Sequence, residues 1–320
     1  MSITRTYTVG NLGGVRRLDD LVGLWVDVPL TNTFPLANVF TLQDVETDLT
    51  NPDKVFVVGQ GDSANALYGI YVSLDAGVTW FIPGGNYQTN IDILGQLQWF
   101  EVHVQDSNNI MVSGSNGYVA FSTDGGLTFN LATQIPPFAL CPLCPLFLSN
   151  VFSLHFISPT VGVVGLASWS ALTIDGGITW GILNSGNPIL ELPAGLMVTA
   201  TGIHLSADQQ VINILSQNGI YRSINGGITF TNTYQFTQNN GRHLTWINDQ
   251  ELWAFGNGSE RINTTDGGLT WNIINAWTPA GAGQFAAHFY DGQNGFYSQN
   301  ADILSTNNGS LSGVVSETSP

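Results

Sequence analysis

Short apolar runs, separated by glycine, asparagine and aspartate, make up most of the chain. Five of these runs occupy equivalent places in successive stretches: residues 100–104, 152–156, 201–205, 244–247 and 286–289. Apolar or alternating runs of about four to eight residues, bounded by turn residues, predict β-strands. No window of a dozen residues keeps a helical period, so we expect an all-β protein without a long helix.

An eight-residue polar phrase follows these strands and returns along the chain. It reads Ser/Thr-x-Asp/Asn-x-Gly-x-Thr-Trp/Phe, and its third position recurs at steps of 49, 51, 50, 41 and 41 residues. That position is held by Asp75, Asp124, Asp175, Asn225, Asp266 and, in a degenerate last copy, Asn307. Asp and Asn accept hydrogen bonds from nearby backbone amides, and the glycine accommodates a positive φ. Each phrase therefore predicts a tight turn between two strands, with these six side chains in a structural role.

Aligned on the turn, each repeat has room for four short strands. Four such strands in about 40–50 residues are typical of one blade of a β-propeller. Six turns predict a six-bladed propeller, which we place in a single domain over residues 23–320 behind an N-terminal arm of residues 1–22. The sixth phrase lacks its Thr-Trp, whereas residues 23–30 contain a Leu-Trp, so we expect this N-terminal strand to close the ring by completing the last blade. A seventh blade from residues 1–35 is the alternative.

The repeated phrase resembles the Asp-box, also called the bacterial neuraminidase repeat. Five good copies and one degenerate copy cover about residues 36–312. The resemblance implies the Asp-box propeller superfamily, which includes sialidases, xyloglucan-cleaving hydrolases, sortilin-type receptors and photosystem II assembly factors. In these proteins the motif is a structural turn on the outer part of the blade. The repeat layout is most similar to that of the assembly factors, although the chain shows neither their targeting segment nor their basic patch.

Charge and composition narrow the classes of partner. Only 9% of the residues are charged, and the net charge is −16, with Lys54 the single lysine. Such a chain does not suit the phosphate backbone of nucleic acids or anionic lipid head groups. We also find no apolar stretch long enough for a membrane span and no signal peptide. A surface rich in amides, without a secretion signal, favours a virion protein exposed on a released particle.

Two segments are candidates for binding other protein subunits. Arg5, Arg16 and Arg17 are three of the seven basic residues, and they belong either to a frayed terminus or to an arm that docks onto an acidic neighbouring subunit. The apolar, proline-rich stretch 135–148 is the second candidate, through Phe138, Leu143 and Phe147, unless it is buried under its own propeller. Its Cys141 and Cys144 suggest a local disulfide or packed thiols, because a tetrahedral zinc site needs more ligands.

Catalytic chemistry finds little support in the sequence. A sialidase needs an arginine cluster for the substrate carboxylate, and no arginine lies between Arg17 and Arg222. A glycoside hydrolase needs two opposed carboxylates. The acidic candidates outside the phrases are Asp92, Glu101, Asp106, Glu191, Asp208, Asp249, Glu251 and Asp291. Several of them recur where turns are expected, so a turn role is the simpler interpretation.

Four histidines recur in the first strands of the repeats: His103, His155, His204 and His288. Core or channel-lining side chains are a simpler interpretation than metal ligands, because alternate side chains of a strand pack between blades. We therefore predict no catalytic residue, cofactor or metal, and a non-catalytic structural or interaction propeller. The specific hypothesis is a virus or phage particle component that contacts other protein subunits or glycans, within an oligomeric assembly. The alternatives are a glycoside hydrolase for neutral polysaccharide and an assembly scaffold for a membrane complex.

Overall fold

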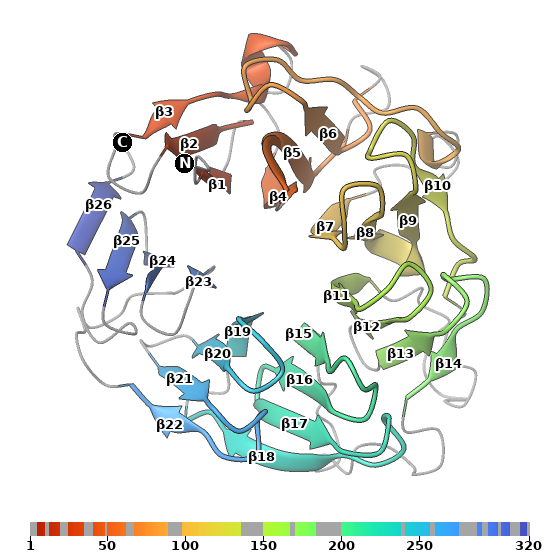
Figure 1. Cartoon of the computed structure of the whole chain (residues 1–320), viewed down its shortest axis with the longest axis vertical. Helices are drawn as coiled ribbons and strands as arrows, with labels where there is room; N and C mark the ends of the chain where they lie inside the picture. The colour runs from red at the N-terminus through yellow and green to blue at the C-terminus, as the bar shows by residue number, and fades with distance from the viewer. Residues whose placement is uncertain are drawn as a thin grey trace. The chain divides into compact units, whose positions relative to one another are not determined.

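The computed structural model describes most of the chain. The described residues are 5–9, 13–19, 25–34, 41–48, 50–61, 67–88, 98–135, 150–166, 170–183, 200–237, 241–256, 260–274, 287–289, 294–299, 302–307 and 314–318. They divide into two compact units, Met1–Gly162 with Thr173–Trp180, and Val163–Leu172 with Gly181–Pro320. Their regular secondary structure is almost entirely β-strand (Figure 1), in agreement with the predicted all-β class.

The first unit contains antiparallel sheets whose strands follow one another in the chain. Its strands are β1 (Arg5–Val9), β2 (Val15–Asp19), β3 (Val26–Asp27), β4 (Leu42–Asp48), β5 (Asn51–Gly59), β6 (Ile70–Ser73), β7 (Trp99–Val104), β8 (Ile110–Gly114), β9 (Val119–Ser122), β10 (Asn130–Leu131) and β11 (Val151–Phe156). Strands β1 to β3 form one sheet, β4 to β6 a second, and β7 to β10 a four-stranded third. Short 3-10 helices lie at Leu30–Asn32 and Ser115–Gly117.

The second unit repeats the four-stranded pattern. Its strands are β12 (Gly162–Leu166), β13 (Ser170–Thr173), β14 (Gly181–Ile182), β15 (Ala200–Leu205), β16 (Ile212–Ser216), β17 (Gly219–Ser223), β18 (Thr231–Gln235), β19 (Gly241–Trp246), β20 (Leu252–Gly256), β21 (Arg261–Thr264), β22 (Asn272–Ile273), β23 (Ala287–Phe289), β24 (Asn294–Gln299), β25 (Asp302–Asn307) and β26 (Val314–Thr318). The first residue of β12 and the last residue of β13 belong to the first unit. Each of the series β15 to β18, β19 to β22 and β23 to β26 is one sheet.

First strands of consecutive sheets lie next to one another within each unit. In the first unit β1 contacts β4, β4 contacts β7, and β7 contacts β11; in the second unit β15 contacts β19, and β19 contacts β23. The sheets therefore face each other, and apolar side chains fill the layers between them. One such layer joins Phe56 and Val72 to Trp99 and Val112, all fully buried.

The repeated phrases form turns with one hydrogen-bond pattern. In each of the five good copies the hydroxyl of the first residue accepts the N–H of the fifth, a glycine, at 2.7–3.0 Å. The N–H of the seventh residue, a threonine, donates to the Asp or Asn of the third position at 2.8–3.0 Å. The fifth residue has φ between 81° and 87°, a conformation that favours glycine. The first three residues of the sixth phrase, Ser305 to Asn307, lie in β25, and residues 308–312 are outside the described residues.

The N-terminal strands differ from the expectation. Instead of an arm, residues 5–9 and 15–19 form a hairpin in register from Arg5 opposite Asp19 to Val9 opposite Val15. The strand expected to close the last blade, Val26–Asp27, pairs with β2, while β26 is the fourth strand of the last sheet. The physical reason is that β2 offers a backbone edge close in sequence, and Val15 and Leu18 anchor it in the core. The number of blades and the single-domain boundary at residue 23 stay predictions.

Candidate functional site

Three carboxylates on the first strands of the first unit form the most unusual electrostatic feature. Asp44 and Glu46 lie two residues apart on β4, and Glu101 lies on β7. An Asp44 oxygen accepts the Val102 N–H at 3.0 Å, a Glu46 oxygen accepts the Val104 N–H at 2.7 Å, and a Glu101 oxygen accepts the Leu154 N–H at 2.7 Å. Each carboxylate thus supplies an acceptor to the exposed backbone edge of the next first strand, which would otherwise need water or another partner.

These carboxylates have raised pKa values. Burial in the protein is the main cause for all three, although each side chain keeps partial access to solvent. The charge of Asp44 adds to the effect at Glu46 and Glu101, and raises their pKa values well above the usual range for glutamate. A raised pKa favours the protonated form of the Glu101 carboxyl group, which is the direction of shift that a general acid requires.

Three of the histidines predicted on first strands, His103, His155 and His204, contact groups of neighbouring elements. His103 Nε2 lies 2.9 Å from the Phe156 carbonyl oxygen, and its ring meets the His155 ring edge-on at 5.3 Å. In the second unit, His204 Nε2 lies 3.3 Å from Asp249 Oδ1. Burial lowers the pKa of His103 and of His204 to about 4, so both rings are neutral at pH 7. In the described parts of the chain, no group of three His, Cys, Asp or Glu residues is arranged to hold a metal.

Two acidic residues suspected of turn roles do accept hydrogen bonds from their own turns. Asp106 accepts the N–H groups of Asn108 and Asn109, and Asp208 accepts the N–H of Gln210. Asp249 differs, because its carboxylate reaches from the loop after β19 to the Ala207 N–H at 2.9 Å. Of the other acidic candidates, Asp92, Glu191 and Asp291 fall outside the described residues.

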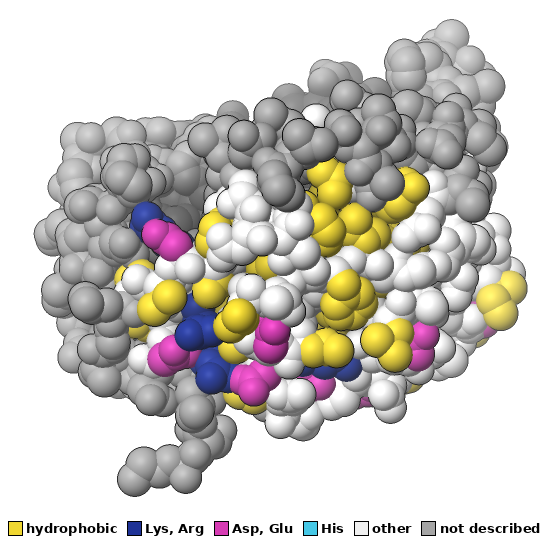
Figure 2. All heavy atoms as spheres, turned by 90° about the horizontal axis from the view of Figure 1, so that it is seen from above, with side chains coloured by type: hydrophobic (Ala, Val, Ile, Leu, Met, Phe, Trp, Pro, Cys, Tyr) yellow, Lys and Arg dark blue, Asp and Glu magenta, His cyan; other side chains and the backbone are white. Residues whose placement is uncertain are grey.

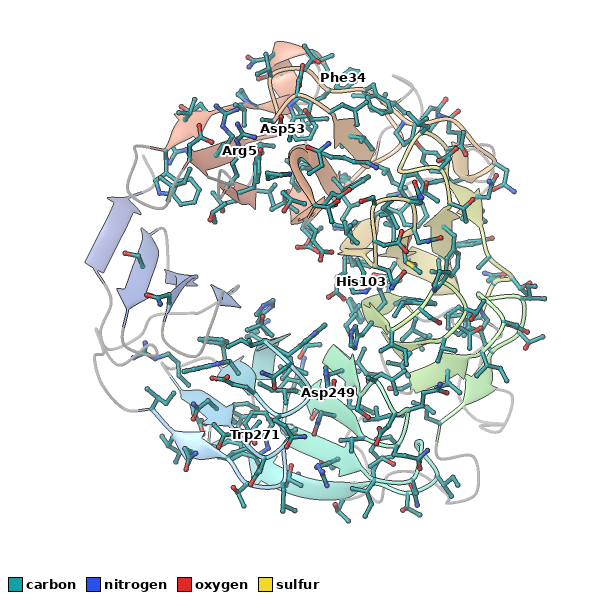
Figure 3. All side chains as sticks on the ribbon, in the orientation of Figure 1. Arg5, Phe34, Asp53, His103, Asp249 and Trp271 are labelled. Carbon is teal, nitrogen blue, oxygen red and sulfur yellow. The ribbon has the colours of Figure 1, made fainter. Side chains whose placement is uncertain are left out.

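The N-terminal arginines bind acidic groups of their own chain. Arg5 pairs with Asp19 at 2.9 Å and also with Asp53, beside which it lies in Figure 3. Arg16 pairs with Asp27 at 2.8 Å, and Arg17 pairs with Asp19 at 3.1 Å. Because these arginines are paired within the chain, they do not form the free basic surface that docking onto an acidic subunit would need. A role in binding a partner stays a prediction for them, and the apolar candidates Phe138, Leu143 and Phe147, with Cys141 and Cys144, lie outside the described residues.

Other cations are also used to hold sheets together. Arg17 Nη1 donates to the Ala76 carbonyl in the first repeat turn at 2.7 Å, and Arg222 Nε donates to the Gly267 carbonyl in the fifth at 2.9 Å. Lys54 Nζ donates to the Ser107 carbonyl at 2.6 Å. Arg261 is buried, which leaves Arg242 as a solvent-exposed basic side chain in this part of the chain. Most described cations therefore have structural partners within the chain.

Exposed aliphatic side chains recur on the repeat turns, and the sequence reasoning missed them. The second and sixth positions of the turns carry Leu74, Val78, Leu127, Ile174, Ile178, Ile224, Ile228 and Leu269, each more than half exposed. On the face shown in Figure 2, hydrophobic side chains reach the surface among uncharged polar ones, while basic and acidic side chains lie beside each other. The pattern was available in the repeat alignment, where the sixth position is aliphatic in all five good copies and the second position in three of them, although the turn geometry does not need this. Exposed apolar groups that recur in this way are candidates for protein contacts.

Solved structures similar to this chain are β-propellers. YCF48 from Cyanidioschyzon merolae is 15% identical with a TM-score of 0.61, over 87% of this chain and 86% of that one. YCF48 bound to D1 peptide is 13% identical with a TM-score of 0.63, over 95% and 87%. An ancestral GH74 enzyme is 16% identical with a TM-score of 0.57, but this chain spans only 38% of it.

These likenesses show that the chain has a β-propeller fold, as the sequence predicts. No protein-family model matches the sequence, and no curated protein has significant sequence similarity to it. Among the described residues, no helix is long and apolar enough to cross a membrane.

Proposed function

We propose that this chain is a non-catalytic interaction module that binds another protein through the outer surface of its repeat turns. The observation that carries the proposal is the set of exposed aliphatic side chains at equivalent turn positions, such as Ile174, Ile178 and Ile228, each about two-thirds exposed. Fixed turns hold these side chains in place, so binding a partner costs little ordering of the surface. A propeller of the same fold, YCF48, has been solved with a D1 peptide, which supports a protein segment as the ligand.

The specific setting that we propose is a virus or phage particle. Its support is compositional: a low content of charged residues and a net charge of −16 suit a surface exposed on an assembled particle. The experiment is co-sedimentation of the protein with purified particles, together with the position of its gene relative to capsid or tail genes. A protein that stays in the soluble fraction, and whose gene lies away from particle genes, contradicts this setting while leaving protein binding intact. An assembly scaffold for a membrane complex would then be the better setting.

The second candidate is hydrolysis of neutral polysaccharide. It is favoured by the raised pKa of Glu101, which suits a general acid, and by the acidic side chains of Asp44 and Glu46 on the neighbouring strand. The test is release of reducing sugar from xyloglucan by the wild type and by Glu101→Gln. Sugar release that disappears in the variant would establish the hydrolase, and absence of release from either protein would remove it.

A further inference from the structure

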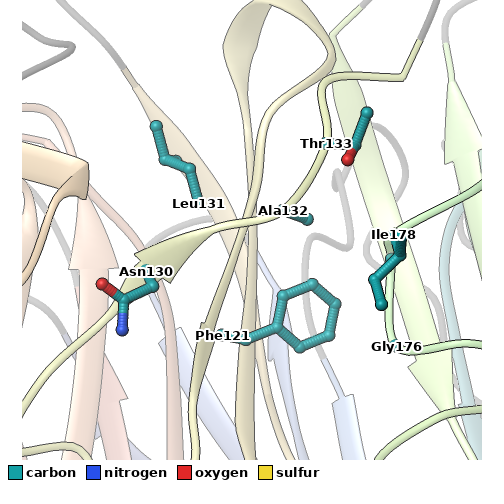
Figure 4. A pocket seen from close by; sticks show the side chains of 8 residues that line it. Phe121, Asn130, Leu131, Ala132, Thr133, Gly176 and Ile178 are labelled. Atoms are coloured by element: carbon teal, nitrogen blue, oxygen red, sulfur yellow. The ribbon is translucent and has the colours of Figure 1, made fainter.

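An open hollow of about 260 Å³ lies beside the third repeat turn, in the first unit of the chain (Figure 4). Phe121 at the end of β9 and Ile178 in the turn line it from different elements, and Ala132 and Gly177 are also among its lining residues. For comparison, an apolar cavity of about 150 Å³ holds a benzene molecule. The hollow therefore has room for one large apolar side chain.

The walls of the hollow are fixed by contacts behind them. The Phe121 ring meets the buried Phe156 ring edge-on at 5.4 Å. The Thr133 N–H donates to the Gly177 carbonyl at 3.1 Å, and Trp180 Nε1 donates to the Thr133 carbonyl at 3.1 Å. An incoming side chain would thus meet a surface that is already formed, which lowers the entropic cost of binding.

The hollow exists because an alanine occupies a position that holds a larger residue after the next turn. Ala132 follows the last residue of the second turn by three positions, and Leu183 follows the last residue of the third turn by the same number. Both make the same backbone bond at 2.9 Å, from Ala132 to Val119 and from Leu183 to Ser170. In the second unit, Leu183 packs onto Gly227 of the fourth turn. At the third turn Ala132 reaches Gly177 only with its Cβ, and the Phe121 ring lies beside it, so the space beyond Ala132 that a leucine would fill stays open.

An acidic residue adjoins the lining of the hollow. None of its lining residues is charged, and the Asp175 carboxylate lies in the turn that forms one wall. Hydrogen bonds from Thr179 lower the pKa of Asp175, so it is ionised at neutral pH. A second copy of this chain, at a net charge of −16, would be repelled, whereas a cationic segment would be attracted.

We propose that this hollow binds one aliphatic or aromatic side chain of a partner protein, and that a neighbouring arginine or lysine of the partner pairs with Asp175. This inference rests on the proposed function, because it assigns the place and the chemistry of the protein contact. A buried apolar anchor surrounded by polar contacts is the usual form of an interface hot spot.

The probe is a library of random dodecamer peptides displayed on phage and selected on the wild-type protein. Enriched peptides are then synthesised, and their affinities are measured by fluorescence polarisation for each variant. We expect the enriched sequences to place Leu, Ile, Phe or Trp next to Arg or Lys. Sequences rich in Asp or Glu, or without a large apolar residue, would contradict the proposed chemistry.

Ala132→Leu is the main variant, because it fills the hollow with the residue that the chain itself uses at the next turn. Ile178→Asp removes an apolar wall, and Ile273→Asp is its control, because Ile273 is also an exposed isoleucine but lies on β22, outside the repeat turns. We expect the first two to weaken binding at least about tenfold, and the control to stay within about twofold. Thermal melting curves check that each variant is folded. If Ile178→Asp unfolds, the test depends on Ala132→Leu alone. This variant should fold, because the chain already has a leucine, Leu183, at the equivalent position after the next turn.

Asp175→Asn tests the charge without changing the turn, since Asn225 holds the fourth turn with the same backbone bond at 3.0 Å. We expect about threefold weaker binding at low salt and almost no difference at high salt, while the control Asp266→Asn has no effect. Peptides that bind Ala132→Leu as tightly as wild type would refute this site but leave protein binding standing. If no peptide binds any variant, both proposals fail. Loss of self-association in Ala132→Leu, measured by sedimentation, would identify a second copy as the occupant and refute the cationic partner.

Discussion

Replacing Asp266 by alanine removes three hydrogen bonds from the fifth repeat turn at once. The carboxylate accepts the Thr270 N–H at 2.9 Å, the Thr270 hydroxyl at 2.6 Å and the Thr264 hydroxyl at 2.7 Å. After the change, Thr264 can still accept the Gly268 N–H at 3.0 Å, so the turn keeps one of its ties. We therefore expect a measurable loss of stability but a folded protein.

The magnitude follows from the pKa of the carboxyl group. Partial burial raises this pKa, but the hydrogen bonds from Thr270 and Thr264 lower it by a larger amount. The net change is from 3.8 to about 2. Such a fall corresponds to about 2 kcal/mol of stabilisation at pH 7. Because the carboxylate is partly exposed to solvent, screening reduces the expected loss in Asp266→Ala to about 1 kcal/mol. Asp266→Asn should lose at most about 0.5 kcal/mol, since the fourth turn uses Asn225 in this place.

Urea unfolding of the wild type and both variants at pH 7 and at pH 2 measures this effect. A carboxyl group with a lowered pKa stabilises the folded state above its ordinary pKa, and the contribution disappears as the pH falls from 3.8 towards 2. The difference between wild type and Asp266→Ala should accordingly shrink at pH 2. Equal stability of the two proteins at pH 7, or an equally large difference at pH 2, would refute the reasoning.

Two further predictions concern the first unit. Burial, followed by the charges of Asp44 and Glu46, raises the pKa of Glu101, so the free energy of unfolding should fall as the pH rises from 4.5 through the raised value. Glu101→Gln, which keeps an acceptor for the Leu154 N–H, should be about 1–2 kcal/mol more stable than wild type at pH 7 and equal to it below pH 4, as measured by urea unfolding; a less stable variant at pH 7 would contradict this. Leu18→Ala should lose about 2–5 kcal/mol, because Leu18 is only 2% exposed, and a wild-type melting temperature would mean that β2 is dispensable.

The repeat turns could be predicted from local sequence alone. Ser122, Asp124, Gly126 and Thr128 interact with one another within a few residues, so their spacing was enough to predict the bend. The carboxylates of Asp44 and Glu46 were not identified, although their alternation on one strand was a usable signal. Their partners, Val102 and Val104, are 58 positions away, and no local pattern indicates which backbone edge lies opposite.

The fate of the N-terminal residues illustrates the same limit. The sequence indicated a basic N-terminus with Arg5, Arg16 and Arg17. It did not show that these arginines would pair with the carboxylates of Asp19, Asp27 and Asp53. The pairing of Val26–Asp27 was misassigned because the Leu-Trp of residues 24–25 resembled the strand start that follows each turn. Such a resemblance indicates a strand, whereas its neighbour depends on which edge is left open when the sheets pack.

By itself, the sequence determined the strands, the turns and the propeller class, because these depend on alternation and on hydrogen bonds within a phrase of eight residues. Tertiary structure alone decided which side chains have shifted pKa values and which line a hollow. It raised the pKa of Glu101 by burial beside other carboxylates, and it left a hollow where Ala132 faces a turn that a larger residue could cover. Burial and cavities arise between elements distant in the chain, so they are set by packing and not by local pattern.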